Sequence, residues 1–221
     1  MSEDSRFFNQ NHRALQDRFL TRDLADRIEA EDVVDFIGPD EKQFIESARM
    51  FFLTTVSHSG QPTVSYKGGQ PGFVCVQSET SILFPSYDGN GMYYSTGNLD
   101  QNNKVGLLFI DFETPNRLRI HGDATIVFDD TYVKRFPGAQ FVVRVDIREA
   151  FDNCPRYIHR MTLTEESKYV PSHLGMAPRP AWKRLDYLQT ALSQGEREKT
   201  DREGGPLSLT EYLQLLKQAE A

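Results

Sequence analysis

The sequence predicts a mainly β protein: an antiparallel β-barrel of six strands with flanking helices. Between Met50 and Phe151, segments rich in β-branched and aromatic residues recur at short intervals. Short turn sequences separate them, such as His58-Ser59-Gly60 after the first segment. Helical patterns lie before and after this region. Many short strands joined by short turns are typical of a closed antiparallel barrel rather than of alternating strands and helices.

The composition fits one domain with additional elements and excludes some partners. The chain has 221 residues, 38% of them hydrophobic and 26% charged, which is the balance of an ordinary globular protein. Its formal net charge of −7 argues against non-specific nucleic-acid binding, which needs clustered basic residues. We therefore expect no nucleic-acid partner.

The same sequence predicts a cytoplasmic protein. No run of about 18 apolar residues occurs, so we expect no membrane span. The N-terminus is acidic and polar, unlike a signal peptide. Cys75 and Cys154 are the two cysteines, and they form no disulfide framework, so a reducing compartment is the simpler expectation.

Residues 1–49 form the predicted N-terminal helical segment. Loosely helical spacing of apolar residues covers 7–24, and a second segment over 28–37 ends at Gly38-Pro39. Pro39 is well placed to open the next helix, whose first turn carries acidic residues that favour the helix dipole.

Residues 50–151 form the predicted barrel. The extended segments are 50–57, 62–68, 73–77, 81–87, 104–112, 117–128 and 141–151. A short helix is predicted over 93–101, after a turn formed by Asp88-Gly89-Asn90-Gly91. The strands 104–112 and 141–151 are more apolar than one small barrel interior requires, so we expect a homodimer.

Residues 152–221 form the predicted C-terminal helical extension of the same domain. We expect helices around 157–161 and over 181–192, a charged linker over 195–205, and a final helix over 208–219. Ser208 and Glu211 make a capping box at the start of the last helix.

The run from Ser86 to Ile126, SYDGNGMYYSTGNLDQNNKVGLLFIDFETPNRLRIHGDATI, resembles the FMN-binding split β-barrels related to pyridoxamine 5′-phosphate oxidase. The order of pieces carries the resemblance: a strand, a turn with a short helix, an Asn-rich helix end, an apolar strand and a strand ending in glycine. It extends over about residues 40–185. It implies a six-stranded split barrel, FMN as cofactor and a homodimer with the flavin at the seam.

The residues of the turn also suit FMN on chemical grounds. A turn leading into a helix N-terminus offers unpaired N–H groups to a phosphate, and Asn90, Gly91, Ser95 and Asn98 lie on or after this turn. The resemblance adds Lys67 near the flavin, Arg117 where a flavin-contacting glutamine usually lies, and 154–160 reaching the other subunit's flavin. If 157–161 is helical, Arg156 and Arg160 share one face and can meet a phosphate.

The chain departs from its relatives at two places. Relatives often carry an arginine or an Arg-Lys pair where this chain has Met92-Tyr93-Tyr94-Ser95, so Lys67 or the partner's arginines must meet the phosphate charge. The arginine and histidine that bind pyridoxal phosphate are not identifiable in RPAWKRLDYLQ (179–189), which argues against vitamin B6 oxidation.

Other readings of these residues stay open at this point. Lys67 can be a solvated strand end, Gly89 and Gly91 serve a tight turn with or without a ligand, and Arg117 suits a solvent-facing edge. Arg156 and Arg160 can instead pair with acids such as Glu149 or Asp152. The histidines lack metal-ligand spacing, so we expect no metal site.

Two functions follow from this sequence. The first is an FMN-dependent oxidoreductase acting on a small molecule, and the second is a non-catalytic flavin-binding or interaction protein on the same scaffold. The sequence identifies no catalytic residues, because the flavin itself carries the chemistry.

Overall fold

The chain folds around one antiparallel sheet of seven strands. This computed structural model describes residues 5–218. The strands are β1 (Met50–Val56), β2 (Pro62–Gly68), β3 (Cys75–Ser78), β4 (Ser81–Tyr87), β5 (Lys104–Asp111), β6 (Asn116–Val127) and β7 (Ala139–Asp152). Their order across the sheet is β2-β1-β5-β6-β7-β4-β3. The predicted mainly β fold with flanking helices is confirmed, but the expected six strands are seven, because every extended segment forms its own strand.

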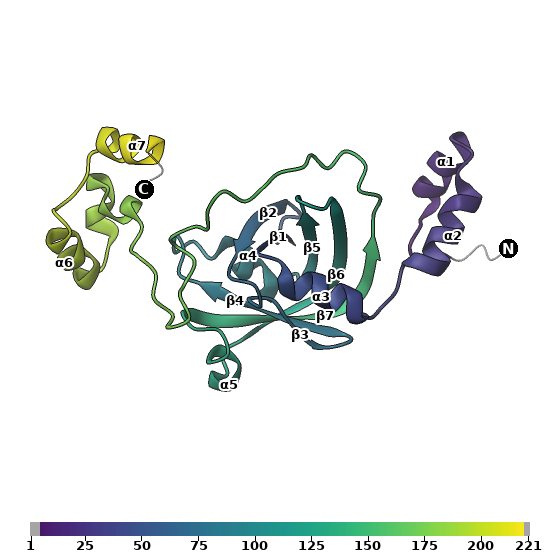
Figure 1. Ribbon diagram of the computed structural model, residues 1–221, viewed down its shortest axis with the longest axis horizontal. Helices are drawn as coiled ribbons and strands as arrows, with labels where there is room; N and C mark the ends of the chain where they lie inside the picture. Colours follow the sequence, from purple (N-terminus) through teal and green to yellow (C-terminus); the bar gives the residue numbers. More distant parts are fainter. Residues whose placement is uncertain (1–4, 219–221) are drawn as a thin grey trace.

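The long strands β6 and β7 bend the sheet into a barrel (Figure 1). Their register shifts by one residue between His121 and Gly122. A Cβ on Gly122 would lie 2.6 Å from the carbonyl oxygen of Asp146, so only glycine fits this irregularity. The shift increases the local twist of the sheet where β6 pairs with β5 on one side and with β7 on the other.

Four phenylalanines form the centre of the barrel core. The ring of Phe51 lies 5.1 Å from those of both Phe84 and Phe109 and 5.9 Å from that of Phe73, centroid to centroid. All four side chains are buried, and they come from β1, the loop before β3, β4 and β5. The ring of Phe51 therefore packs residues of several strands together. Buried residues alternate with less buried ones along β1 and β5, and the period-2 pattern of the sequence reflects this alternation.

The second apolar face of β7 is covered within the chain. A smaller cluster of Leu83, Val142 and Phe136 lies there, beside the short helix α5 (Asp130–Val133). The helix begins with the Asp129 side chain capping the amide of Thr131. Val142 of β7 is thus buried inside one subunit, and the homodimer stays a prediction.

Three helices precede the barrel: α1 (Gln10–Arg18), α2 (Arg22–Asp32) and α3 (Pro39–Ser47). The predicted helix after Gly38 is confirmed as α3, and it packs the fully buried Ile45 on the core. Helices α1 and α2 bury no residue completely. Phe7, which precedes α1, contacts the barrel: its ring packs edge to face on that of Phe151, with a centroid distance of 5.3 Å.

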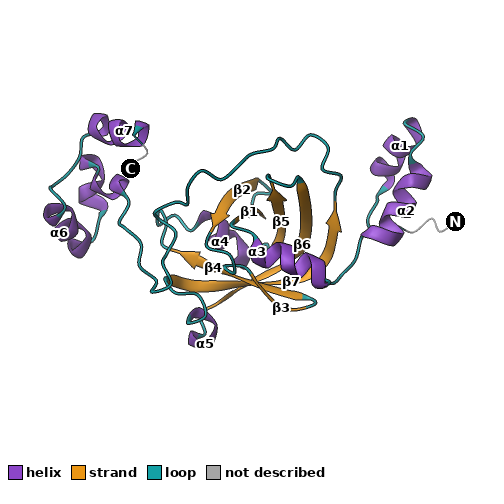
Figure 2. Cartoon of the chain, in the orientation of Figure 1, coloured by secondary structure: helices purple, strands orange, loops and turns teal. Residues whose placement is uncertain are grey.

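Residues 153–180, here called the strap, form a single long loop between β7 and the C-terminal helices (Figure 2). The helix expected around 157–161 is wrong. Tyr157 has a positive φ of 72°, which no α-helix accepts. The strap is instead held by backbone contacts, such as Met161 N–H to the carbonyl of Phe112 at 3.0 Å.

The C-terminal unit comprises η2 (Ala181–Arg184), η3 (Asp186–Ala191), α6 (Gln194–Arg202) and α7 (Leu209–Lys217). The helix expected over 181–192 is two 3₁₀ helices. The expected charged linker over 195–205 is largely the helix α6, because Ser193 caps it and Arg179 pairs with Glu196 and Glu203 along one side. The final helix and its capping box are confirmed.

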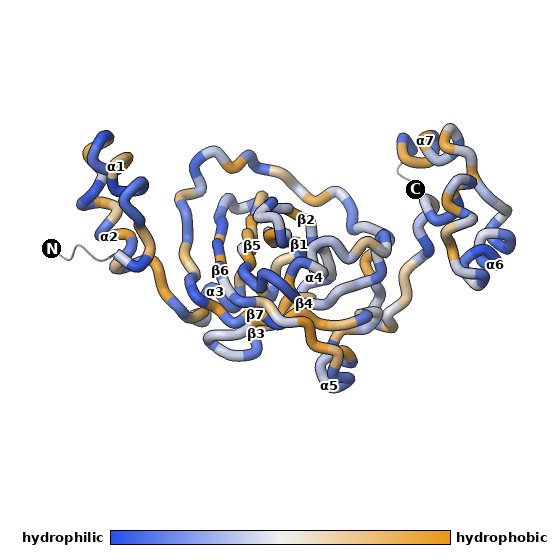
Figure 3. Tube along the Cα trace, turned by 180° about the vertical axis from the view of Figure 1, so that it is seen from behind, coloured by the Kyte–Doolittle hydropathy of each residue, from blue (hydrophilic) through white to orange (hydrophobic). Residues whose placement is uncertain are grey.

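The two helical ends lie on opposite sides of the barrel, with α1 and α2 at one end and α6 and α7 at the other (Figure 1). The apolar residues gather on the strands, whereas α6 is strongly hydrophilic (Figure 3). Across residues 5–218, every helix is too short or too polar to span a bilayer.

Candidate functional site

A cavity of about 290 Å³ lies where the ends of β2 and β4 meet the turn before α4 (Tyr94–Gly97). The register of β1 and β2 explains which side chains reach it. Lys67 pairs with Phe51 and Ser65 with Leu53, and both partners are buried in the core. Because paired residues share a face, Lys67 and Ser65 point to the inner side of the sheet.

Lys67 lies in this cavity as a half-buried cation. Burial lowers the pKa of its ammonium below the usual value, because the charged form loses hydration. No hydrogen bond or ion pair of Lys67 joins it to any other residue among 5–218. Burying an unpaired charge costs free energy, so an ammonium in this environment favours binding of an external anion. The reading of Lys67 as a solvated strand end does not fit this environment.

Hydroxyl groups surround the cation. Ser95 Oγ donates to Ser65 Oγ at 3.0 Å, which joins the start of α4 to β2. Ser86, Tyr87 and Thr96 line the same cavity. Burial raises the pKa of the Tyr87 phenol, and its neutral hydroxyl can donate a hydrogen bond into the cavity.

The turn of residues 88–93 is fixed in an unusual conformation. The Asn90 side chain accepts a hydrogen bond from Met92 N–H at 3.0 Å, and Gly91 has a φ of 76°. Tyr93 also lies in the left-handed region, at φ 48°. Its hydroxyl donates to Gln140 Oε1 at 3.0 Å, which holds the strained residue in place. Backbone strain of this kind often marks a binding site.

Asn98 supports the site from behind. Its amide donates to the buried Thr55 Oγ1 at 3.0 Å, which attaches the end of α4 to β1. It does not line the cavity. Of the predicted residues, Lys67, Asn90, Gly91 and Ser95 are therefore brought together, and Asn98 positions the helix that carries Ser95.

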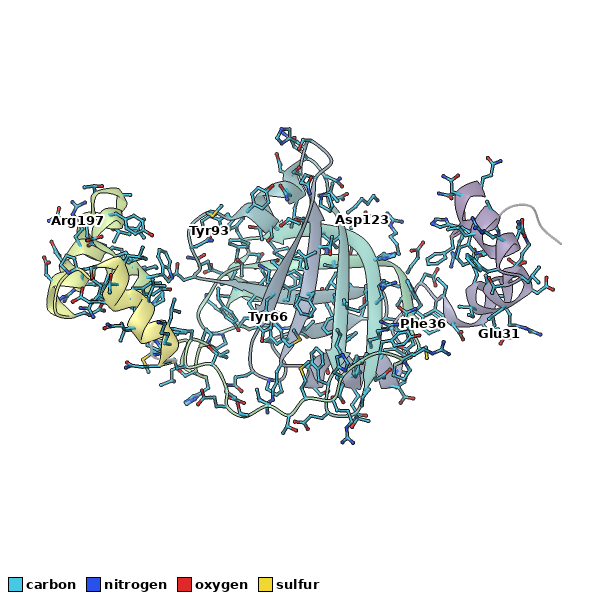
Figure 4. All side chains as sticks on the ribbon, turned by 90° about the horizontal axis from the view of Figure 1, so that it is seen from above. Glu31, Phe36, Tyr66, Tyr93, Asp123 and Arg197 are labelled. Atoms are coloured by element: carbon cyan, nitrogen blue, oxygen red, sulfur yellow. The ribbon has the colours of Figure 1, made fainter. Side chains whose placement is uncertain are left out.

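Arg117 lies on a different face. It pairs in register with Ile110, which alternates with buried Phe109 on β5, so Arg117 points to the outer side of the sheet. Its Nε is buried and has no hydrogen-bond partner among residues 5–218. The outer face also carries Phe52, Leu108 and Tyr66, and Tyr66 is 63% exposed. Figure 4 shows Tyr66 and Tyr93 on separate parts of the barrel.

Arg156 and Arg160 are exposed on the strap, away from the cavity of their own chain. Because the segment is not helical, the expected shared helix face does not exist. Arg160 Nε donates to the carbonyl of Glu113 at 3.2 Å, at the turn between β5 and β6. Glu149, one of the two acids offered to these arginines in the alternative reading, instead contacts His121 Nδ1 at 2.8 Å.

Four residues that line the cavity were not predicted from the sequence: Ser65, Ser86, Tyr87 and Thr96. One signal pointed to Ser65, because it lies two residues before Lys67 and so shares its face on a strand. The other three reach the cavity through the pairing of β4 with β7 and the docking of α4, and no local pattern marks that arrangement.

Together these residues form a site for an anion with a polar tail. Lysine, hydroxyl and amide groups line the cavity, and no Asp, Glu, His or Cys does so within the part of the chain that the structure describes. Such a site can bind a phosphate by charge-assisted hydrogen bonds. Lys67 and Tyr87 can hold or move a proton there, and redox chemistry at this site would need a bound cofactor.

Comparison with solved structures finds partial likenesses. HupZ of Group A Streptococcus is 17% identical, with 57% of this chain and 99% of that chain covered and a TM-score of 0.44. HutZ of Vibrio cholerae, a haem storage protein, is 20% identical (52% and 94% covered, TM-score 0.41). An FMN-binding protein of Syntrophomonas wolfei is 12% identical (62% and 97% covered, TM-score 0.41). No curated protein matches the chain.

The family comparison is more decisive. The family model described as pyridoxamine 5′-phosphate oxidase matches residues 37–162, from the end of the N-terminal helices to the first part of the strap. This span is more than half of the chain and contains all seven strands together with the cavity around Lys67. The protein therefore belongs to the pyridoxamine 5′-phosphate oxidase family.

Proposed function

We propose that this protein is an FMN-binding flavoprotein, and that it acts as an oxidoreductase on a small molecule. The observation that carries the proposal is Lys67, a half-buried ammonium with no acidic partner among residues 5–218. The FMN phosphate, with a charge of about −2, supplies the missing counter-charge. Bound FMN would accept hydride or electrons from the substrate.

Each nearby residue has a role in holding the phosphate. Lys67 compensates its charge, and the hydroxyls of Ser65 and Ser95, already joined at 3.0 Å, offer donors beside it. Gly91 and Tyr93 shape the backbone of the turn through their positive φ angles. The cavity of about 290 Å³ is at the lower limit of small-molecule sites. It therefore suits the phosphate end of FMN, and the rings need further walls.

A second copy of the chain supplies these walls in our proposal. The outer face of β2, β1 and β5 carries Val64, Tyr66, Phe52 and Leu108, and the first two are 64% and 63% exposed. An apolar sheet face of this kind is characteristic of obligate dimers. Arg117 lies on this face with a buried, unpaired Nε, where it can meet the flavin across the seam and stabilise negative charge on the reduced ring.

The strap is the other partner element. Arg156 and Arg160 are exposed at its start, and Cys154 to Arg160 extends from the barrel without a helix. We propose that these arginines serve the flavin of the partner subunit. The two free cysteines, Cys75 and Cys154, agree with a cytoplasmic protein.

Flavin titration of purified protein tests the proposal. Lys67→Ala should weaken FMN binding by about 1–3 kcal/mol, the effect of losing a charge-assisted hydrogen bond. Lys134→Ala is the matched control, since Lys134 is 77% exposed and does not line the cavity. Equal affinity of the two variants would exclude this phosphate site, and haem bound in preference to FMN would replace the flavin assignment.

The alternative is a non-catalytic flavin-binding or interaction protein. The absence of an arginine in the segment Met92–Ser95 favours it. Anaerobic addition of NADH or NADPH to the FMN-loaded protein separates the two functions. Bleaching of the flavin absorbance supports the oxidoreductase, and an unchanged oxidised spectrum with both donors supports the alternative.

A further inference from the structure

A second and larger cavity, of about 560 Å³, lies between the barrel and the C-terminal unit. Its walls come from the turn at 87–90, the strap at 169–180, and the helix α6. Figures 1 and 4 place the C-terminal helices on the side of the barrel that carries α4 and Tyr93. The volume is well within the range of sites for small organic molecules.

This cavity is built by specific contacts. Lys183 Nζ donates to Asp88 Oδ2 at 2.6 Å, and the Lys183 side chain is only 13% exposed. Arg179, 11% exposed, donates to Glu196 at 2.9 Å and to Glu203 at 2.7 Å. These ion pairs join the barrel turn, the strap and α6 into one wall. The cavity is therefore not an accidental gap beside a loosely placed helix.

The charges of the cavity compensate one another. Six charged side chains line it: Asp88, Arg179, Lys183, Glu196, Lys199 and Glu203. Lys183 pairs with Asp88, Arg179 with both glutamates, and Lys199 with Glu196 at 2.8 Å. A charged ligand would have to break one of these ion pairs to gain a partner. The free energy lost with the broken pair is about as large as the free energy gained from the new one. The site is therefore suited to an uncharged ligand.

Apart from Asn90, the remaining lining residues are aromatic residues, prolines, glycines and one alanine. Three aromatic side chains face the cavity, those of Tyr87, Tyr169 and Trp182. Three prolines lie between them, Pro171, Pro178 and Pro180. Aromatic and proline rings offer flat surfaces on which another ring can stack at little entropic cost. We propose that this cavity binds a neutral, planar aromatic or heteroaromatic small molecule.

The inference does not depend on the flavin site. The two cavities share only Tyr87, Gly89 and Asn90, which form the wall between them. The lysine of the smaller cavity, Lys67, does not reach the larger one. Ligands in both would contact the same short segment, but the other walls of the larger cavity come from the strap, η2 and α6, which do not line the smaller one.

Tryptophan fluorescence gives a direct test, because Trp182 is the single tryptophan of the chain. The flavin-free protein is titrated with acridone, a neutral tricyclic ring, and with acridone-10-acetate, the same ring with a carboxylate. Acridone should quench Trp182 saturably, and the carboxylate should bind at least about tenfold more weakly, since each cation among the described lining residues already has an acidic partner. Linear quenching without saturation, or equal binding of the two probes, would overturn the proposal.

Three variants locate the bound ring. Tyr169→Ala should weaken acridone binding by about fivefold to tenfold, the effect of one lost aromatic contact, and Tyr169→Phe should retain it. Tyr187→Ala is the matched control, because Tyr187 is 63% exposed in the same unit and does not line the cavity. Equal weakening by Tyr187→Ala, or none by Tyr169→Ala, contradicts the site.

Repeating the titration with FMN present separates the two cavities. Acridone affinity should be unchanged at saturating FMN if each ligand has its own site. Mutual displacement would place acridone in the flavin cavity and reject the inference. If the protein binds no FMN at all, the flavin proposal fails, whereas the titration of the flavin-free protein still decides this one.

Discussion

Gly138 and Gly175 lie back to back where the strap meets the start of β7. A Cβ built on Gly175 would stand 2.6 Å from the backbone nitrogen of Gly138, and both residues have positive φ, 76° and 85°. Backbone atoms cannot move aside as a flexible side chain would. These two glycines, far apart in sequence, therefore fix the strap on the barrel and with it one wall of the larger cavity.

We expect Gly175→Ala to destabilise the docked strap by about 2–4 kcal/mol, because it combines a disfavoured φ with a backbone clash. Gly72→Ala is the matched control: Gly72 has a φ of 88° but open space around a Cβ, so it should cost only about 1 kcal/mol. Urea unfolding and proteolysis within 153–180 measure the difference. Similar losses for the two variants would show that the close contact is not needed.

Acid should loosen the contact between α6 and the strap. Ion pairing with Lys199 and Arg179 lowers the pKa of Glu196 from 4.5 to about 2. Since the folded pKa is depressed, this stabilisation is complete above pH 4.5 and is lost as the pH falls toward about 2. We expect about 1–2 kcal/mol, less than the full linkage value, because Lys199 is half exposed.

The fluorescence of Trp182 between pH 5 and about 2 reports this transition. Glu196→Gln should weaken the contact at pH 7 and flatten the pH dependence in this window. A profile identical to that of the unsubstituted protein would assign the acid transition to other groups.

Lys67→Met should stabilise the flavin-free protein while it weakens FMN binding. The pKa of Lys67 is lowered by burial, so the folded state binds this proton less well than the unfolded state. The resulting penalty is present below the lowered pKa and disappears above 10.5. At pH 7 we expect a gain of about 1 kcal/mol, or about 2–4 °C in Tm.

Thermal unfolding of Lys67→Met and of Lys134→Met, a surface control, provides the measurement. The control should leave Tm unchanged. A lower Tm for Lys67→Met would mean that Lys67 has an anionic partner even without flavin.

Tyr66→Glu should dissociate the proposed dimer. A carboxylate on the outer face of β2 would be buried without a partner in the interface, which costs several kcal/mol. Leu216→Glu is the control, since Leu216 is 48% exposed on α7, on another part of the chain. Sedimentation of the unsubstituted protein and of both variants at micromolar concentration is the measurement. A folded monomer of the unsubstituted protein would refute the dimer itself.

Subunit mixing tests whether the strap serves the partner's flavin. A chain with Arg156→Ala and Arg160→Ala is combined with a Lys67→Ala chain, each deficient in flavin alone. With sites shared across the seam, the mixed dimer has one intact and one doubly damaged site, so about half the flavin capacity returns. If nothing returns, each chain builds its own pocket and the cross-subunit role is rejected.

Local patterns in the sequence determined most of the barrel and the ends of several helices. The alternation of apolar residues from Met50 to Asp152 predicts the strands, because one face of each must be buried against core residues such as Phe51 and Phe109. Pro39 and the Ser208–Glu211 box likewise mark helix starts by local hydrogen bonding. The turn at Asn90 and Gly91 was also readable, since its conformation depends on the residues within it.

Tertiary structure alone decided the rest. Nothing near Tyr157 in sequence shows that the strap is unwound, and nothing near Glu196 shows that Arg179, seventeen residues earlier, turns a charged segment into a packed helix. The pairing of β1 with β2 directs Lys67 inward, whereas the pairing of β5 with β6 directs Arg117 outward. Sequence gives each residue its chemistry and local preference, but which side chains share a cavity depends on long-range pairings that no local pattern specifies.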